Sequence, residues 1–387
     1  MRKLYVWSFF LFFSIMALGC AQESGVPKTL LVGLVDVSEG RFAFFNDSLA
    51  VNTRLALGAV SDNGLIRKDG RYVRVQFLTR PMTDTNDAPR QTLYEAVNTH
   101  GAQVVIGGAR SKTAVGMARA AQELEVPFLA TTATAPAVSE GSAFTFPTSP
   151  STDVQARLYA AFLREAPDVK KVALLVEEDT LFAADFADAL RRNLLGSGVL
   201  ISAVRFYGSE DDIVRRLSDI AASEPDAVVM CAIYPHTVVA GAHLKRLGYN
   251  GRLLGIHSRQ AFVFPEDIVI PSGMPVQYLS YWNPERASPL TRGYVEAFER
   301  AVGRTPTEDD AFVYDTMLRL IAAVETADEL TSAGLQRALA AMSGMEGVVG
   351  SYHFLPESSL DTVWNVTLLD GGAVIEDIHP SASGTRQ

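Results

Sequence analysis

The sequence predicts an α/β protein with two doubly wound lobes, each a parallel sheet covered by helices on both faces. Three observations support this prediction. The 387 residues give room for two domains. Short apolar segments with strand spacing alternate with segments of helical spacing along most of the chain. The alternation restarts near the middle, after Pro147 and Pro150.

The first half opens with an apolar strand at residues 29–35 and a segment of helical spacing at 48–60. Val73, Val75 and Phe77 alternate with polar neighbours, which indicates a second strand. Further strands are expected at 104–106 and 127–131, and helices at 88–98 and 113–124. Such successive strand–helix units are typical of a parallel sheet that is buried on both faces.

The second half repeats the pattern. We expect helices at 155–164, 183–195, 213–222 and 236–247, and strands at 172–176, 200–206, 227–231 and 253–256. Beyond Pro271 follow a strand at 276–281, helices at 289–302, 312–327 and 332–342, and late strands near 352 and 364–369. This remainder is too short for a third domain, so it should be shared between the lobes through a three-segment hinge.

The amino terminus has the pattern of an export signal. Arg2 and Lys3 precede an apolar run at 4–18, which is shorter than the roughly 20 residues of a membrane-spanning helix. The run ends in Ala17-Leu18-Gly19-Cys20, which resembles the bacterial lipobox. We therefore expect an exported, extracytoplasmic protein that is lipid-anchored to a membrane through Cys20. The alternative is an incidental Cys20 and cleavage after Ala21.

The charge and the missing motifs exclude several classes of function. A net charge of −10 argues against nucleic acid as a partner. The sequence contains no P-loop, dinucleotide fingerprint, nucleophile elbow or zinc-protease helix, so we expect neither a cofactor nor a catalytic residue. His236 and His243 share one face of a predicted helix without a third ligand, so no metal site is expected. Cys231 lies in an apolar run and should be a core residue.

Candidate ligand-binding residues follow the predicted strands, because open α/β sheets bind ligands beyond the carboxyl ends of their strands. The candidate loops are residues 38–45, 107–113 and 131–136. Hydroxyl groups and free backbone N–H groups at a helix start favour an anionic group such as a carboxylate. Ser111 could hold such a group, or it could be a simple N-cap of the following helix.

Four segments in order resemble one known family. They are Val105-Ile106-Gly107 with Ser111, the run 130–136, the run 146–150 and the run 310–315. The chain is similar, over about residues 30–374, to type I periplasmic binding proteins of the branched-chain amino acid group. The resemblance implies a monomeric receptor that captures a small-molecule solute between its lobes and delivers it to the membrane permease subunits of an ABC importer.

The resemblance also implies roles for particular residues. Ser111 would hold a ligand carboxylate, and Thr132 and Thr134 would add a backbone N–H and a hydroxyl. Phe45, or alternatively Phe42 or Phe44, would form an apolar wall in the first loop. The remaining implied positions lie in the second lobe, and they are Phe182, Tyr234 and His257.

His257 stands where amino-acid receptors of this group carry an acid for the ligand ammonium. An imidazole cannot replace a carboxylate in that role. We therefore expect an anionic or neutral organic solute rather than a standard amino acid, although Asp309 could supply a compensating acid. The cationic side chains Arg41, Arg110, Lys112 and Arg259 in the candidate loops could also simply face solvent.

The resulting organisation is a lipoprotein signal peptide at 1–19, a tether at 20–28 and a tail at 381–387. The first lobe comprises 29–147 and 280–350, and the second comprises 148–279 and 351–380. Three other functions remain open. They are a ligand-sensing module for a signalling partner, an envelope lipoprotein with a degenerate cleft, and an enzyme on a Rossmann-like fold.

Overall fold

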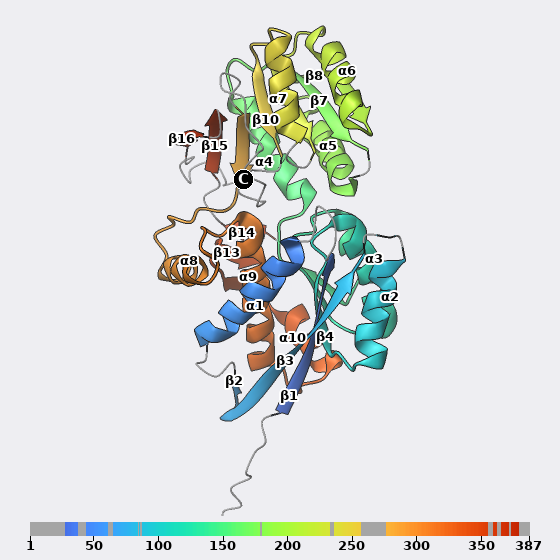
Figure 1. Cartoon of the computed structure of the whole chain (residues 1–387), viewed down its shortest axis with the longest axis vertical. Helices are drawn as coiled ribbons and strands as arrows, with labels where there is room; N and C mark the ends of the chain where they lie inside the picture. The colour runs from blue at the N-terminus through green and yellow to red at the C-terminus, as the bar shows by residue number, and fades with distance from the viewer. Residues whose placement is uncertain are drawn as a thin grey trace, which may run out of the picture.

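The computed structural model of the chain describes residues 28–37, 44–60, 65–83, 85, 87–178, 180–232, 236–256, 276–354, 359–361, 365–370 and 373–378. The predicted signal peptide, Cys20 and most of the tether lie outside these residues, as do Tyr234 and His257. Within them, the structure confirms two α/β lobes built on mostly parallel sheets (Figure 1).

The sheet of the first lobe has the strand order β2-β3-β1-β4-β5-β6. Its strands are β1 (Lys28–Val37), β2 (Leu65–Lys68), β3 (Arg71–Met82), β4 (Val104–Gly107), β5 (Phe128–Ala130) and β6 (Thr145–Pro147). Only β2 runs antiparallel to its neighbour among these pairings. The helices α2 (Ala88–Tyr94) and α3 (Ser111–Leu124) cover one face. A π-helical turn (Glu95–Thr99) extends α2, so the helix predicted at 88–98 changes its winding halfway.

The other face of this sheet is covered by helices that come from both ends of the chain. They are α1 (Phe44–Val60), α8 (Pro289–Val302), α9 (Glu308–Thr326) and α10 (Ser332–Ala341). Leu30 and Val32 of β1 belong to one buried cluster with Leu49 of α1 and Met317 of α9. This packing explains why the late helices belong to the first lobe, because they bury apolar stripes against its sheet.

The sheet of the second lobe has the order β16-β15-β11-β10-β9-β7-β8. Its strands are β7 (Lys171–Glu177), β8 (Leu200–Tyr207), β9 (Ala227–Cys231), β10 (Arg252–Gly255), β11 (Val276–Ser280), β15 (Asn365–Asp370) and β16 (Ala373–Ile378). The first five are parallel, and β15 and β16 are antiparallel additions. The helices are α4 (Thr152–Glu165), α5 (Leu181–Leu194), α6 (Glu210–Ala221) and α7 (His236–Arg246).

The chain passes between the lobes three times. It crosses between β6 and α4, between β11 and α8, and between β14 and β15. The strands β12 (Gly344–Glu346), β13 (Ser351–His353) and β14 (Ser359–Asp361) form a small antiparallel sheet of the first lobe. Tyr352 of β13 is buried with α9, so the third crossing follows residue 361 and not residue 350.

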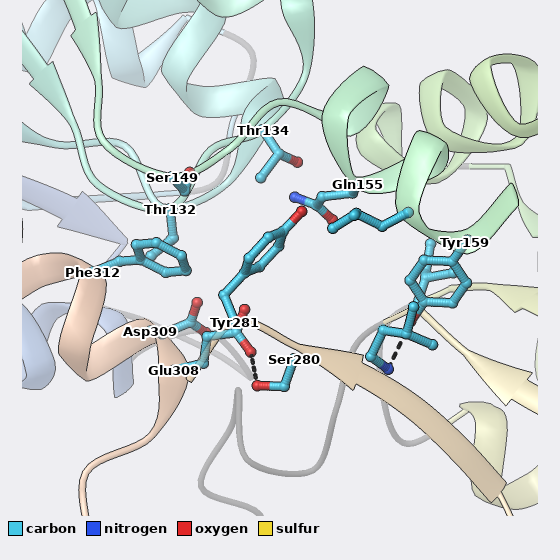
Figure 2. A pocket seen from close by; sticks show the side chains of 13 residues that line it. Thr132, Thr134, Ser149, Gln155, Tyr159, Ser280, Tyr281, Glu308, Asp309 and Phe312 are labelled. Carbon is cyan, nitrogen blue, oxygen red and sulfur yellow. Dashed lines mark hydrogen bonds between the residues drawn. The ribbon is translucent and has the colours of Figure 1, made fainter. Parts of the chain in front are cut away.

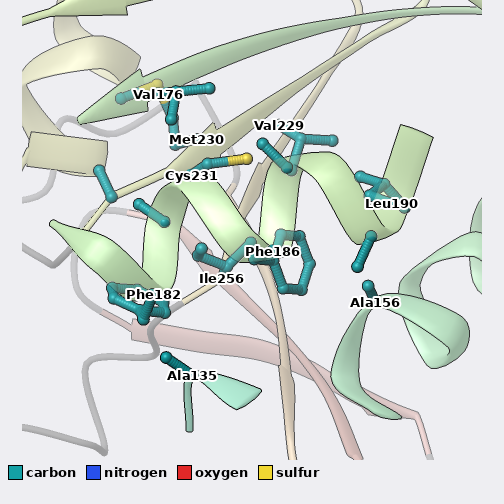
Figure 3. Close-up of a cluster of buried hydrophobic side chains, with 14 of the residues drawn as sticks. Ala135, Ala156, Val176, Phe182, Phe186, Leu190, Val229, Met230, Cys231 and Ile256 are labelled. Atoms are coloured by element: carbon teal, nitrogen blue, oxygen red, sulfur yellow. The ribbon is translucent and has the colours of Figure 1, made fainter. Parts of the chain in front are cut away.

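A large hydrophobic cluster fills the second lobe and continues into the first (Figure 3). Phe186 and Leu190 of α5 are fully buried against the strands β7 and β9. Cys231 lies in this cluster as a small apolar residue, as the sequence predicts, and burial raises the pKa of its thiol far above the ordinary value. Burying one aromatic side chain of this kind stabilises a fold by about 1.5–3 kcal/mol.

No helix within the described ranges combines the length and the apolar composition that crossing a bilayer requires.

Candidate functional site

A pocket lies where the two lobes meet, next to the crossing segments (Figure 2). It encloses about 600 Å³ of space, including space that is open to solvent. Both lobes contribute to its wall, together with the ends of β10 and β11. The described residues that line it are Thr132, Thr134, Ser149, Gln155, Leu158, Tyr159, Ile256, Leu279, Ser280, Tyr281, Glu308, Asp309 and Phe312.

The loop after β5 provides the hydroxyl-bearing wall of the pocket. Thr132 and Thr134 line the pocket, where the resemblance placed a ligand site. The Thr132 hydroxyl already donates a hydrogen bond of 3.2 Å to the carbonyl oxygen of Ala109. This bond ties the loop to the start of α3, and the backbone N–H of Thr152 in α4 donates to the Thr134 carbonyl oxygen at 2.8 Å, so the loop is held from both sides.

Ser111 supports this loop from behind. Its side chain is buried, and its hydroxyl oxygen accepts the backbone N–H groups of Thr134 at 3.3 Å and Ala135 at 3.2 Å. The N-cap of α3 is Arg110, so the interpretation of Ser111 as a simple N-cap is wrong. Its hydroxyl oxygen acts only as an acceptor in these two bonds, which leaves its hydrogen for one further bond.

Tyr159 forms a wall on the side of the second lobe. Its hydroxyl donates to the carbonyl oxygen of Gly255 at 2.6 Å and accepts the N–H of Leu279 at 3.2 Å. Its ring meets Phe186 edge-to-face at 5.1 Å. Burial raises the pKa of this hydroxyl far above its ordinary value, so the side chain stays neutral. Tyr159 therefore fixes β10 and β11 against α4 beside the pocket.

The start of α9 brings two carboxyl groups to the opposite wall. Glu308 accepts a hydrogen bond of 2.5 Å from the Ser280 hydroxyl. Burial raises the pKa of Glu308 to about 7, although that bond and the Tyr281 backbone N–H oppose the shift. Asp309 is only 7% exposed. Burial and the neighbouring negative charges raise its pKa well above the ordinary value.

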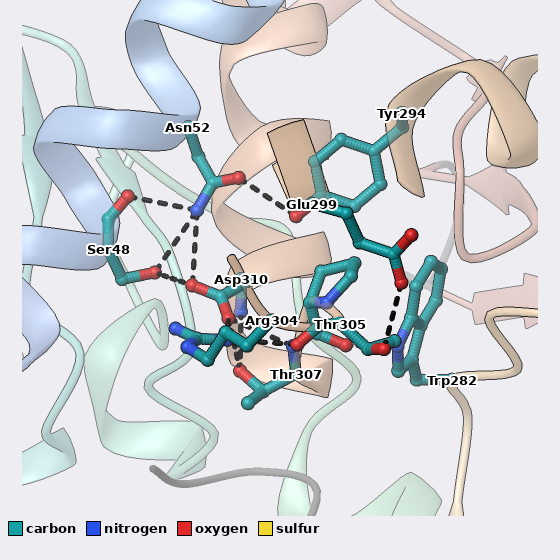
Figure 4. A network of polar contacts seen from close by, with 10 residues as sticks. Ser48, Asn52, Trp282, Tyr294, Glu299, Arg304, Thr305, Thr307 and Asp310 are labelled. Atoms are coloured by element: carbon teal, nitrogen blue, oxygen red, sulfur yellow. Dashed lines mark hydrogen bonds and ion pairs between the residues drawn. The ribbon is translucent and has the colours of Figure 1, made fainter. Parts of the chain in front are cut away.

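A polar network holds the start of α9 in place (Figure 4). Asp310 accepts hydrogen bonds from the Ser48 hydroxyl at 2.5 Å and from Thr307, whose backbone and side chain both donate to it. Arg304 pairs with the same carboxylate at 2.7 Å. Thr307 and Asp310 thereby form a capping box, which fixes the first turn of the helix and hence the direction of the pocket acids.

Two further predicted residues lie elsewhere in the structure. Phe45 of α1 and Phe182 of α5 are buried in the hydrophobic cluster that continues from one lobe into the other, and neither lines this pocket. Figure 3 shows Phe182 beside Ala135 of the first lobe. Tyr234 and His257 lie outside the described residues, so their roles stay predictions.

The sequence-based reasoning did not assign most of the pocket. Ser149 and Phe312 lie in runs that carried the family resemblance, so those runs were the only available indication of them. Gln155, Ser280 and Glu308 follow no motif, and they reach the pocket because three crossing segments converge there. Among the residues that the structure describes, no group of three or more His, Cys, Asp or Glu side chains could hold a metal ion.

Two lobes, three crossings and a pocket between them define the class of type I two-lobed binding proteins. The profile of the periplasmic binding protein family matches residues 29–362, and the chain belongs to that family. No curated protein sequence matches the chain.

Solved structures share the fold at low sequence identity. A leucine-binding protein of Thermotoga maritima has a TM-score of 0.77 and 18% identity, covering 91% of this chain and 99% of its own. A branched-chain amino acid transporter substrate-binding protein of Streptococcus pneumoniae, in complex with isoleucine, has a TM-score of 0.75 and 18% identity over 91% and 100%. A solute-binding protein of R. palustris, in complex with 4-hydroxybenzoate, has a TM-score of 0.76 and 17% identity over 93% and 100%.

Proposed function

We propose that this protein is the extracytoplasmic receptor of an ABC importer and captures a small organic solute by closure of its two lobes. The observation that supports the proposal is the pocket, to which both lobes and the crossing segments contribute side chains. A solute that contacts both walls only in the closed form shifts the population toward that form. The closed form is then what the permease subunits would recognise.

The lining of the pocket favours an amino-acid-like or carboxylate solute. Thr134 and Gln155 offer polar groups, while Leu158, Ile256 and Phe312 offer an apolar surface. Such a mixture of a few polar groups on apolar walls is typical of small-molecule sites. Fold relatives that bind leucine, isoleucine or 4-hydroxybenzoate point to the same range of solutes. The proposal involves binding and release without a chemical change in the solute.

Export and anchoring complete the proposal. A signal peptide at 1–19 would direct export and be removed, and a lipid on Cys20 would hold the receptor beside its permease, with residues 20–28 as the tether. One acyl chain binds a membrane only marginally, so stable anchoring requires a multiply acylated cysteine. Mass spectrometry of the mature protein from its membrane fraction would reveal the modification, and an unmodified Cys20 would contradict it.

The proposed function is tested by a thermal-shift screen of the soluble form that begins after Cys20. The panel contains amino acids, benzoates and short-chain carboxylates. A solute at 100 times its dissociation constant adds about 2.7 kcal/mol of stability, which a melting curve resolves. Thr134→Val removes one pocket hydroxyl and should reduce the shift. Thr326→Val makes the same change at the exposed end of α9 and should leave it unchanged.

If no solute stabilises the protein, the import function is refuted in favour of an envelope lipoprotein with a degenerate cleft. If a solute binds but the purified permease complex does not respond to the loaded protein, the receptor is a sensing module instead.

A further inference from the structure

Asp309 is a buried acid with one carboxyl oxygen that has no hydrogen bond to any described residue. Its side chain is 93% buried, and its Oδ2 atom has no hydrogen-bond partner in the part of the chain that the structure describes. The adjacent Asp310 shows the contrast, because its two oxygens are bound by Ser48, Thr307 and Arg304. The contacts of Asp310 therefore anchor the start of α9. A buried carboxyl oxygen without a hydrogen bond destabilises a fold, so the stability of α9 does not account for Asp309.

The surroundings of Asp309 are negative. Glu308, Asp310 and Asp36 all act on it with the same sign of charge. The described residues that line the pocket include no lysine, arginine or histidine. An ammonium group that enters this end of the pocket therefore meets carboxyl groups that can ionise against it, and no described cation competes for them.

Asp309, Phe312 and Tyr281 line the same pocket, and Figure 2 shows the carboxyl group of Asp309 below the two rings. Aromatic faces attract a cation as well, and they also accept the methylene groups next to it. The hydroxyl groups of Thr132, Thr134 and Ser149 belong to the wall formed by the first lobe. The two kinds of wall suit a solute with a positive group at one end and oxygen atoms at the other.

We propose that Asp309 receives a protonated amine of the solute, so that the receptor selects amines over their deaminated analogues. The inference rests on the proposed function and names the class of solute for the same pocket. Asp309, at the start of α9, would then bind the ammonium group, the role that the resemblance assigns to an acid at the place of His257. The inference therefore reverses the expectation of an anionic or neutral solute.

The proposal predicts a proton release. In the empty pocket, burial and the charges of Glu308, Asp310 and Asp36 favour the protonated form of Asp309. Burial raises the pKa of the neighbouring Tyr281 hydroxyl, so Tyr281 stays neutral. An ammonium group favours the ionised form, so binding should release a proton. Affinity for an amine should then rise with pH, up to tenfold per unit, while the affinity for a deaminated analogue should not.

The experiment uses matched pairs of probes that differ by one amino group. The pairs are leucine and 4-methylpentanoate, phenylalanine and 3-phenylpropanoate, 4-aminobutyrate and butyrate, and 4-(aminomethyl)benzoate and 4-methylbenzoate. Calorimetry in two buffers of different ionisation enthalpy measures affinity and proton release. The variant is Asp309→Asn, and the control is Asp219→Asn, the same change in an exposed acid of α6.

We expect at least one amine to bind the unmodified protein tenfold or more tightly than its partner. Asp309→Asn should abolish that preference and the proton release, while Asp219→Asn keeps both. Equal or weaker binding of the amines, or a preference that survives Asp309→Asn, overturns the assignment of Asp309. If none of these probes nor any solute of the wider screen binds, the proposed function fails, and the assignment fails with it.

A measurement without any solute separates binding from a structural role. If Asp309 serves the solute, Asp309→Asn leaves the melting temperature of the empty protein unchanged or raises it. If Asp309 instead serves the first turn of α9, the melting temperature falls, which overturns the inference while leaving the proposed function intact.

Discussion

Replacing Ser111 by alanine removes a hydroxyl that supports the pocket loop and to which the family resemblance assigns a contact with the ligand. Its oxygen accepts the N–H groups of Thr134 and Ala135, which hold the loop behind the pocket. Its hydrogen is the group that the family resemblance assigns to a ligand carboxylate. We therefore expect Ser111→Ala to lower both the stability of the empty protein and its affinity for solute.

The two effects have separable magnitudes. The two bonds are long, at 3.3 and 3.2 Å, and the variant leaves the half-buried N–H of Thr134 and the buried N–H of Ala135 without this acceptor. At about 1 kcal/mol for each donor, the free energy of unfolding should fall by about 2 kcal/mol. A hydrogen bond to a carboxylate is worth about 1.5–3 kcal/mol, so the dissociation constant should rise by roughly 10- to 100-fold.

Urea unfolding of the empty protein gives the first quantity, and calorimetry with a solute from the screen gives the second. Ser139→Ala makes the same change outside the pocket lining and should alter neither. A Ser111→Ala protein that loses stability but binds within twofold of the original would show that Ser111 only supports the loop. A variant with unchanged stability would contradict the two hydrogen bonds.

Three further predictions concern stability. Asp315→Ala should lower the free energy of unfolding by about 3 kcal/mol in urea, because the carboxylate accepts three buried hydrogen bonds; a loss below 1 kcal/mol would contradict this. Burial raises the pKa values of Glu308 and Asp315 to about 7, so the folded state retains protons that the unfolded chain releases above about pH 5. Stability should therefore fall by on the order of 3 kcal/mol between pH 5 and pH 7, and a flat profile in urea titrations would refute it. Arg319→Lys should lower the melting temperature by a few degrees. Arg319 donates a hydrogen bond of 2.7 Å to the Pro147 carbonyl oxygen, and its guanidinium group lies 3.6 Å from the Phe354 ring centroid. Arg300→Lys, the same change at an exposed site, should leave the melting temperature unchanged.

Much of the fold could be predicted from the sequence, because apolar periodicity acts within each element. The run 227–231 is apolar throughout and forms β9 with every residue buried. The segment predicted at 289–302 forms α8 over the same residues. The third crossing was harder to predict, because β13 pairs with β12 on one side and β14 on the other, and no local pattern indicates which lobe receives this small sheet.

The candidate site was only partly predictable for the same reason. Thr132 and Thr134 follow a strand and lie at the pocket, as the position of strand ends suggests. Phe45 and Phe182 were expected near a ligand, but both are buried in the cluster shared by the lobes. The sequence could not distinguish the two places, because a large apolar side chain suits a hydrophobic core as well as the wall of a ligand site.

The sequence by itself determined the alternation of strands and helices, the two-lobed class and the family, since these depend on residues that are close together in the chain. Only the tertiary structure decided the difference between Asp309 and Asp310. Both are acids in the first turn of α9, and sequence patterns treat them alike. Asp310 accepts a hydrogen bond from Ser48, which is 262 residues away in the chain. Asp309 lines the pocket, and its Oδ2 atom has no hydrogen-bond partner among the described residues. Burial and contacts with residues distant in the chain decide this difference, and no local pattern encodes them. Asp310 stabilises the fold, and Asp309 is the acid that we propose for the solute.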